Sequence, residues 1–146
     1  MITTFSESVN AVATYANGRV YTTLGGSDIR HDVEANVERL KSRAMNCLKV
    51  LPVEARERCA ADTFAATKEY VGSARARLTV LLAGKSRGTQ LNQLHDEAQR
   101  HWFAYRNDFC QTMADQEADG RIKELFQYTC LTLHSLSRTR TVFSNL

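Results

Sequence analysis

The four cysteines of the chain are placed symmetrically about its two strongest turn signals. They are Cys47 and Cys59 on either side of Leu51-Pro52, and Cys110 and Cys130 on either side of Gly120. Residues equally distant from the turn of an antiparallel helical hairpin face each other, so both pairs have the spacing that a cross-link between neighbouring helices requires. We predict these two disulfides, although four cysteines allow three pairings and four buried free thiols are the alternative.

Paired cysteines predict an oxidising compartment, because disulfides persist in secreted and periplasmic proteins and are rare in the cytosol. We therefore expect a periplasmic protein. Residues 1–25 lack the basic segment and continuous apolar run of a signal peptide, so we expect the natural precursor to carry a leader that this chain lacks. A cytosolic helical scaffold with reduced thiols is the alternative.

Composition argues against several classes of partner. The net charge is only +3, and Lys and Arg alternate with Asp and Glu without a run of five like charges, which is not typical of a nucleic-acid-binding surface. No apolar stretch approaches the roughly 20 residues of a membrane span. The oligomeric state has no signature in the sequence.

The breaks between periodic apolar segments predict an all-α protein. One Pro and seven Gly in 146 residues leave few places to end a helix. We expect a disulfide-stapled antiparallel bundle over residues 27–146, with about four main helices. The first begins at Ser27, the second runs from about Val53 to Leu82 with Pro52 in its first turn, the third starts near Thr89, and the fourth follows Gly120.

The N-terminal extension, residues 1–26, has two possible structures. Ser6 can cap a short helix that carries Val9, Val12, Ala13 and Ala16 on one side. Alternatively, Asn17-Gly18 can form the turn of a hairpin that pairs Tyr15 with Val20. We favour the helix, because an isolated two-stranded hairpin is marginally stable in water.

Apolar periodicity predicts which side of each long helix faces the core. The first helix presents Ile29, Val33, Val37, Leu40, Ala44 and Leu48, and the second carries Phe64, Tyr70, Leu78 and Leu81. The third presents Leu91, Leu94, Ala98, Trp102, Tyr105 and Phe109, flanked by Gln99, Arg106 and Cys110. The last presents Ile122, Leu125, Phe126, Leu133, Leu136 and Phe143.

No motif for metal binding or catalysis is complete. Asp115-x-Glu117-x-Asp119-Gly120 resembles the start of a calcium-binding loop, but its twelfth position is Phe126 in place of the bidentate Glu. Gly84-Lys85-Ser86 lacks the first Gly of a phosphate-binding P-loop, and the cysteines and histidines lack zinc spacing. We therefore expect no metal, no cofactor and no catalytic residues.

One segment of the third helix resembles a known family. Ala98-Gln99-x-x-Trp102-x-x-Tyr105-Arg106-x-x-x-Cys110 is similar to the A-Q-x-x-W-x-x-Y-R-D-x-x-C hallmark of the LprI-type lysozyme-inhibitor family. Cys130, Ser135 and Arg138 match the C-x4-T-x2-R segment that follows, and Cys47, Cys59 and Tyr70 match its upstream elements. Asn107 and Ser135 replace an Asp and a Thr, and Ala66-Thr67 replace Leu-Asn.

This resemblance implies a small periplasmic or envelope-attached helical protein without enzymatic activity, which inhibits a cell-wall hydrolase of the lysozyme type. Similar domains also occur as immunity proteins that neutralise toxins from rival bacteria. Lysozymes are typically basic and this chain is also net positive, so long-range attraction between them would be weak. A different secreted toxin is therefore the alternative partner.

Candidate binding residues lie in two places. Lys85, Ser86 and Arg87 occupy the glycine-flanked loop between the second and third helices, where Lys85 or Arg87 could pair with the catalytic carboxylates of a muramidase cleft. Arg106 is a further candidate. The matches at Gln99, Trp102, Tyr105, Arg106 and Arg138 imply a structural role, in which a guanidinium stacks on an aromatic ring.

Overall fold

The computed structural model describes residues 12–16, 19–23, 26–117 and 119–145. Its elements are a hairpin of β1 (Val12–Ala16) and β2 (Arg19–Thr23), then α1 (Gly26–Cys47), α2 (Ala55–Ala83), α3 (Gly88–Ala114) and α4 (Gly120–Ser144). The prediction of four long helices after a short N-terminal element is confirmed. Helix α2 begins two residues later than expected, so Pro52 lies in the preceding turn and not in the helix.

The N-terminal element is the hairpin, and the helix we favoured over residues 6–16 is wrong for Val12–Ala16. Strands β1 and β2 pair antiparallel, with Tyr15 opposite Val20. Both strands contain β-branched and aromatic residues, which suit a pleated ladder, whereas a short isolated helix gains little stability. Residues 6–11 and Asn17-Gly18 of these predictions lie outside the described residues.

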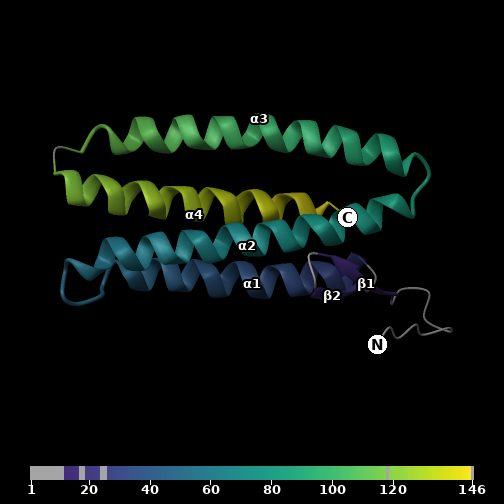
Figure 1. Ribbon diagram of the computed structural model, residues 1–146, viewed down its shortest axis with the longest axis horizontal. Helices are drawn as coiled ribbons and strands as arrows, with labels where there is room; N and C mark the ends of the chain where they lie inside the picture. The colour runs from purple at the N-terminus through teal and green to yellow at the C-terminus, as the bar shows by residue number, and fades with distance from the viewer. Residues whose placement is uncertain (1–11, 17–18, 24–25, 118, 146) are drawn as a thin grey trace.

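The four helices pack with α2 and α4 in the middle, α1 along one side and α3 along the other (Figure 1). Disulfide Cys47–Cys59 joins the end of α1 to the start of α2, and Cys110–Cys130 joins α3 to α4, with Cα–Cα distances of 5.4 and 5.7 Å. Both predicted bonds are confirmed, and they are typical of an oxidising environment. Among the helices of the described residues, none combines the length and apolar character needed to cross a membrane.

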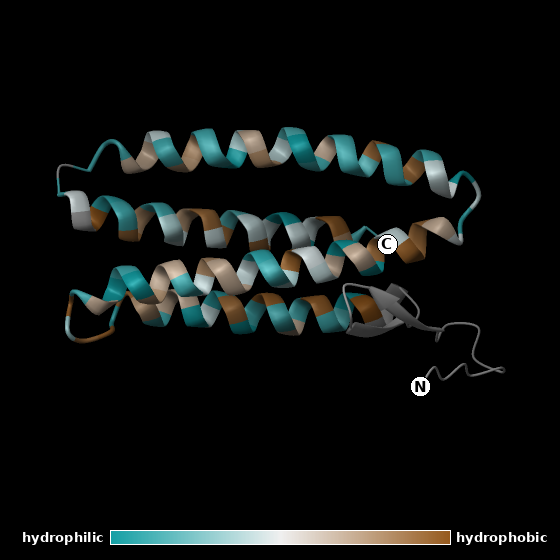
Figure 2. Ribbon diagram, in the orientation of Figure 1, coloured by the Kyte–Doolittle hydropathy of each residue, from teal (hydrophilic) through white to brown (hydrophobic). Residues whose placement is uncertain are grey.

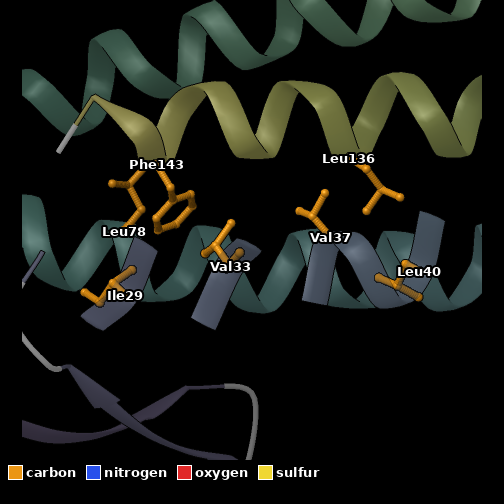
Figure 3. Packing of buried hydrophobic residues seen from close by; sticks show 8 residues of the cluster. Ile29, Val33, Val37, Leu40, Leu78, Leu136 and Phe143 are labelled. Carbon is orange, nitrogen blue, oxygen red and sulfur yellow. The ribbon is translucent and has the colours of Figure 1, made fainter. Parts of the chain in front are cut away.

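The main hydrophobic core lies between α1, α2 and α4 (Figure 3). Helix α1 contributes Ile29, Val33, Val37 and Leu40, each no more than 2% exposed, as its periodicity predicted. They pack against Ala74 and Leu78 of α2 and Leu136 and Phe143 of α4. Burial of one such large aliphatic side chain contributes about 1.5–3 kcal/mol, so this core accounts for much of the driving force for folding.

Helix α3 supplies none of the described residues of this core, and its ribbon is largely hydrophilic in Figure 2. Its buried residues are Gly88, Gln99, Arg106, Cys110 and Ala114. The predicted apolar face is therefore wrong at Leu91, Leu94, Ala98 and Tyr105, which are exposed. The disulfide at Cys110 fixes the rotation of α3, and it turns inward the residues four and eleven positions earlier, Arg106 and Gln99.

Candidate functional site

The turn between α2 and α3, Gly84–Arg87, presents the predicted candidates at one end of the bundle. Lys85, Ser86 and Arg87 are all exposed, and the predicted loop is confirmed. The backbone amide of Lys85 donates to the Leu82 carbonyl, and that of Gly88 donates to the Lys85 carbonyl, each at 3.0 Å. In the described part of the chain, neither Lys85 nor Arg87 forms an ion pair, so both charges are available to a partner.

The backbone of this turn is closely packed. A Cβ on Gly88 would lie 2.4 Å from the Leu82 carbonyl oxygen and 2.9 Å from the Ala83 Cα, so only glycine fits there. Arg87 adopts the left-handed conformation, with φ of 64°, which is uncommon outside glycine and asparagine. The two cationic side chains therefore project from a closely packed backbone turn.

Arg106 occupies the contact between α3 and α4. Its side chain is 9% exposed, and its Nη1 donates to Ser135 Oγ at 2.9 Å. Nε and Nη2 donate to Asn107 Oδ1 at 3.1 and 2.8 Å. The guanidinium lies 4.8 Å from the centre of the Phe103 ring and 5.5 Å from that of Phe64. Burial lowers the pKa of Arg106 from its ordinary value, yet a guanidinium stays charged at physiological pH.

Gln99, Trp102 and Arg138 form the second half of this contact. Arg138 Nε donates to Gln99 Oε1 at 2.9 Å. The guanidinium carbons of Arg106 and Arg138 lie 5.9 and 6.0 Å from the Trp102 ring centre, so one indole contacts both cations. Tyr105, in contrast, is 57% exposed and stacks on Phe109.

These residues, which carry the family resemblance, therefore fasten α3 to α4 through polar and cation–π contacts. Arg106 lies 18 residues along α3 from Gly88, about 27 Å at the rise of an α-helix. The turn and Arg106 consequently belong to different surfaces. The predicted binding residues do not form one site.

An apolar groove lies at the opposite end of the bundle, and it was not among the sites predicted from the sequence. Its volume is about 530 Å³, and its lining includes Met45 of α1, Phe109 and Met113 of α3, and Ile122, Phe126 and Leu133 of α4. Ile122 and Phe126 are 48% and 38% exposed, so the prediction that they face the core is wrong. Their spacing on α4 matched a core stripe, and only the position of the neighbouring helix ends shows that they are exposed in the described part of the chain.

Potential metal ligands are engaged in other interactions. Among the described residues, the one group of three is Cys110, Cys130 and His134, but the two sulfurs are bonded to each other and are not thiolates. In the acidic turn, Asp115 accepts from Lys123 at 2.7 Å and from Gln111 at 2.9 Å, and the hydrogen bond from Lys123 lowers its pKa.

Tyr70, which matches the upstream part of the family pattern, is a partly buried titratable group whose hydroxyl lies in the interior. Its hydroxyl has no hydrogen-bond partner among the described residues. Burial raises the pKa of Tyr70 to about 12, and the negative charge of Asp32 adds to the effect. The ring packs against the main core, so Tyr70 serves the core as an apolar group.

Comparisons with protein-family models, with curated proteins and with solved structures gave no match to this chain.

Proposed function

We propose that the chain is a non-enzymatic periplasmic protein, similar to LprI-type inhibitors, that inhibits a lysozyme-like muramidase by occupying its cleft. The observation that carries this proposal is the closely packed turn Gly84–Arg87, which presents two cationic side chains without ion-pair partners among the described residues. The muramidase cleft contains two catalytic carboxylates, and charge-assisted pairs with Lys and Arg are among the stronger hydrogen bonds.

Local charge outweighs net charge in this proposal. The chain has a net charge of +3, which weakly opposes approach to a basic lysozyme. Repulsion between whole proteins is screened over about 8–10 Å at physiological salt, whereas a pair formed inside a cleft is screened much less. A cationic turn entering an acidic cleft can therefore bind tightly despite slow association.

A lysis assay with matched variants tests this function. The double substitution Lys85→Glu/Arg87→Glu reverses the charge of the turn. Lys41→Glu/Arg43→Glu changes the net charge equally at two exposed positions of α1, away from the turn. We expect the wild type and the α1 variant to slow the clearing of a cell suspension by muramidase, and the turn variant to be weaker by about tenfold or more. Unchanged lysis with excess wild-type protein, across several lysozyme classes, would refute the proposal.

The apolar groove favours a second candidate, an immunity protein that neutralises a secreted toxin other than a lysozyme. Exposed Met and Phe side chains are typical of the centre of a protein interface, and methionine adapts its shape to a partner. The occupant would be an apolar protrusion of the toxin. In the described structure, the disulfide at Cys110–Cys130 supports the wall of the groove.

A secreted protein encoded by a neighbouring gene would be the partner to test. We expect Ile122→Asp/Phe126→Asp to abolish its binding, and Leu94→Asp, which changes an apolar residue 63% exposed outside the groove, to leave binding intact. Equal effects of both variants would contradict a role for the groove. A neighbouring gene of unrelated function would count against the immunity candidate itself.

A further inference from the structure

A cationic pocket lies between α2 and the middle of α3, and Arg106 forms part of its wall. The pocket has a volume of about 340 Å³, and its lining residues are Lys68, Val71, Gly72, Arg75, Phe103, Arg106 and Ser135. Three of these side chains are cations and none is acidic. We call it the Arg106 pocket. It is distinct from both the turn at residues 84–87 and the apolar groove.

The Arg106 guanidinium is buried but not neutralised. In the part of the chain that the structure describes, no carboxylate forms an ion pair with it, although a buried charge is costly without a partner. A guanidinium has five N–H donors, and the three hydrogen bonds to Asn107 and Ser135 leave one N–H on each terminal nitrogen. The two remaining N–H groups can donate to carboxylate oxygens.

The other walls determine what can carry that carboxylate. Val71 and the Phe103 ring are apolar, and a Cβ added at Gly72 would have no atom within 4 Å, so this side is open. Lys68 lies over the Phe64 ring at 4.9 Å and keeps its positive charge near the pocket, whereas the ion pair of Arg75 with Asp96 at 2.5 Å offsets the charge of Arg75. An acid on a short aliphatic stem fits these walls.

We propose that the Arg106 pocket binds a carboxylate on an aliphatic stem, either a Glu or Asp side chain of a protein or a free small carboxylic acid. Ser135 prepares the pocket, because its hydroxyl donates to the Leu131 carbonyl at 2.6 Å and therefore presents a lone pair to Arg106. The bound carboxylate would complete the ion pair that the buried guanidinium lacks. This inference does not depend on inhibition of a muramidase.

Trp102 provides a local readout, since it is the one tryptophan of the chain and its ring lies 5.9 Å from the Arg106 guanidinium. Butyrate is titrated at constant ionic strength while Trp102 fluorescence is followed, with butyramide as the uncharged isostere. We expect a saturable change with butyrate and none with butyramide. Equal responses to both, or no saturable response to any carboxylate probe, would overturn the proposal.

Two variants of Gly72 test the location without altering Arg106. Gly72→Leu fills the open side of the pocket and should weaken butyrate binding by about tenfold or more, whereas Gly72→Ala should leave most of it. Neither should lower the melting temperature, because both replace glycine in a helix by a better helix former. Wild-type titration of a folded Gly72→Leu variant would overturn the proposal.

A capped peptide with one Glu, compared with its Gln counterpart, distinguishes the two sources of the carboxylate. Tighter binding of the Glu peptide than of butyrate supports a protein side chain as the natural ligand. Weaker binding of the Glu peptide than of butyrate supports a free acid. Equal binding of the Glu and Gln peptides, together with no butyrate response, would overturn the proposal.

Discussion

Reduction of the two disulfides should remove a large part of the stability of the bundle. Each bond closes a short loop, with sequence separations of 12 and 20 residues. In the chain-entropy model, loops of this length reduce the entropy of the unfolded chain enough to stabilise the fold by about 3 kcal/mol each. The bonds join different helix pairs, α1 to α2 and α3 to α4, so their effects should add to about 6 kcal/mol.

The assay compares urea unfolding of the oxidised protein with that of protein refolded in reductant. Reduction keeps the sulfur atoms, so the comparison isolates the cross-links from the packing of Cys47 and Cys110, which are both fully buried. For a chain of this length, about 6 kcal/mol corresponds to a melting temperature lower by roughly 20 °C. A loss below about 1 kcal/mol would refute the reasoning that the two cross-links, α1 to α2 and α3 to α4, stabilise the bundle by constraining the unfolded chain.

Three further substitutions test particular contacts. Gly88→Ala should destabilise the fold by about 2–3 kcal/mol in thermal melts, because the added Cβ would clash with the backbone. Gly72→Ala should stabilise the fold by about 0.5–1 kcal/mol. Equal effects of the two substitutions would contradict the close approach at Gly88. Arg106→Ala should lower the free energy of unfolding by about 1–3 kcal/mol, whereas Arg100→Ala, at an exposed position, should lower it by less than about 0.5 kcal/mol. Wild-type melting of Arg106→Ala would refute a structural role. Folding raises the pKa of Tyr70 from 10.0 to about 12. The stability that the neutral phenol contributes to the fold is therefore complete below pH 10 and is lost as the pH rises from 10 to 12. Urea titrations at about pH 11 should show roughly 1 kcal/mol lost in wild type but not in Tyr70→Phe, and identical profiles would contradict burial of the phenol.

The cysteine spacing predicted more of this fold than hydrophobicity did. It identified both disulfides and the two hairpins that they close. Apolar periodicity was sufficient to predict the buried face of α1, because its large aliphatic side chains, such as Ile29, Val33 and Leu40, lie on one side of the helix. It failed for α3, where the buried face carries Gln99 and Arg106, and the apolar positions on the other face are exposed. The predicted bond at Cys110 already indicated the correct face.

The apolar groove and the Arg106 pocket could not be predicted from one sequence. Ile122 and Phe126 match a core stripe, and their exposure depends on where α1 and α3 end relative to α4. The positive charge of Arg106 was evident from the sequence. That no described carboxylate pairs with it depends on the packing of side chains from three helices. The hairpin could have been predicted from the sequence, because Asn-Gly between β-branched segments is a strong turn signal.

Competition for the cleft of a muramidase tests the proposed function most directly. The affinity of the chain for a catalytically inactive muramidase is measured by calorimetry with and without a chitin oligosaccharide that fills the substrate cleft. If the turn at Gly84–Arg87 enters that cleft, the apparent dissociation constant should rise linearly with the free sugar concentration, and Lys85→Glu/Arg87→Glu should bind weakly with or without sugar. Affinity that is unchanged at saturating sugar, or no binding to any muramidase, would contradict inhibition by occupation of the cleft.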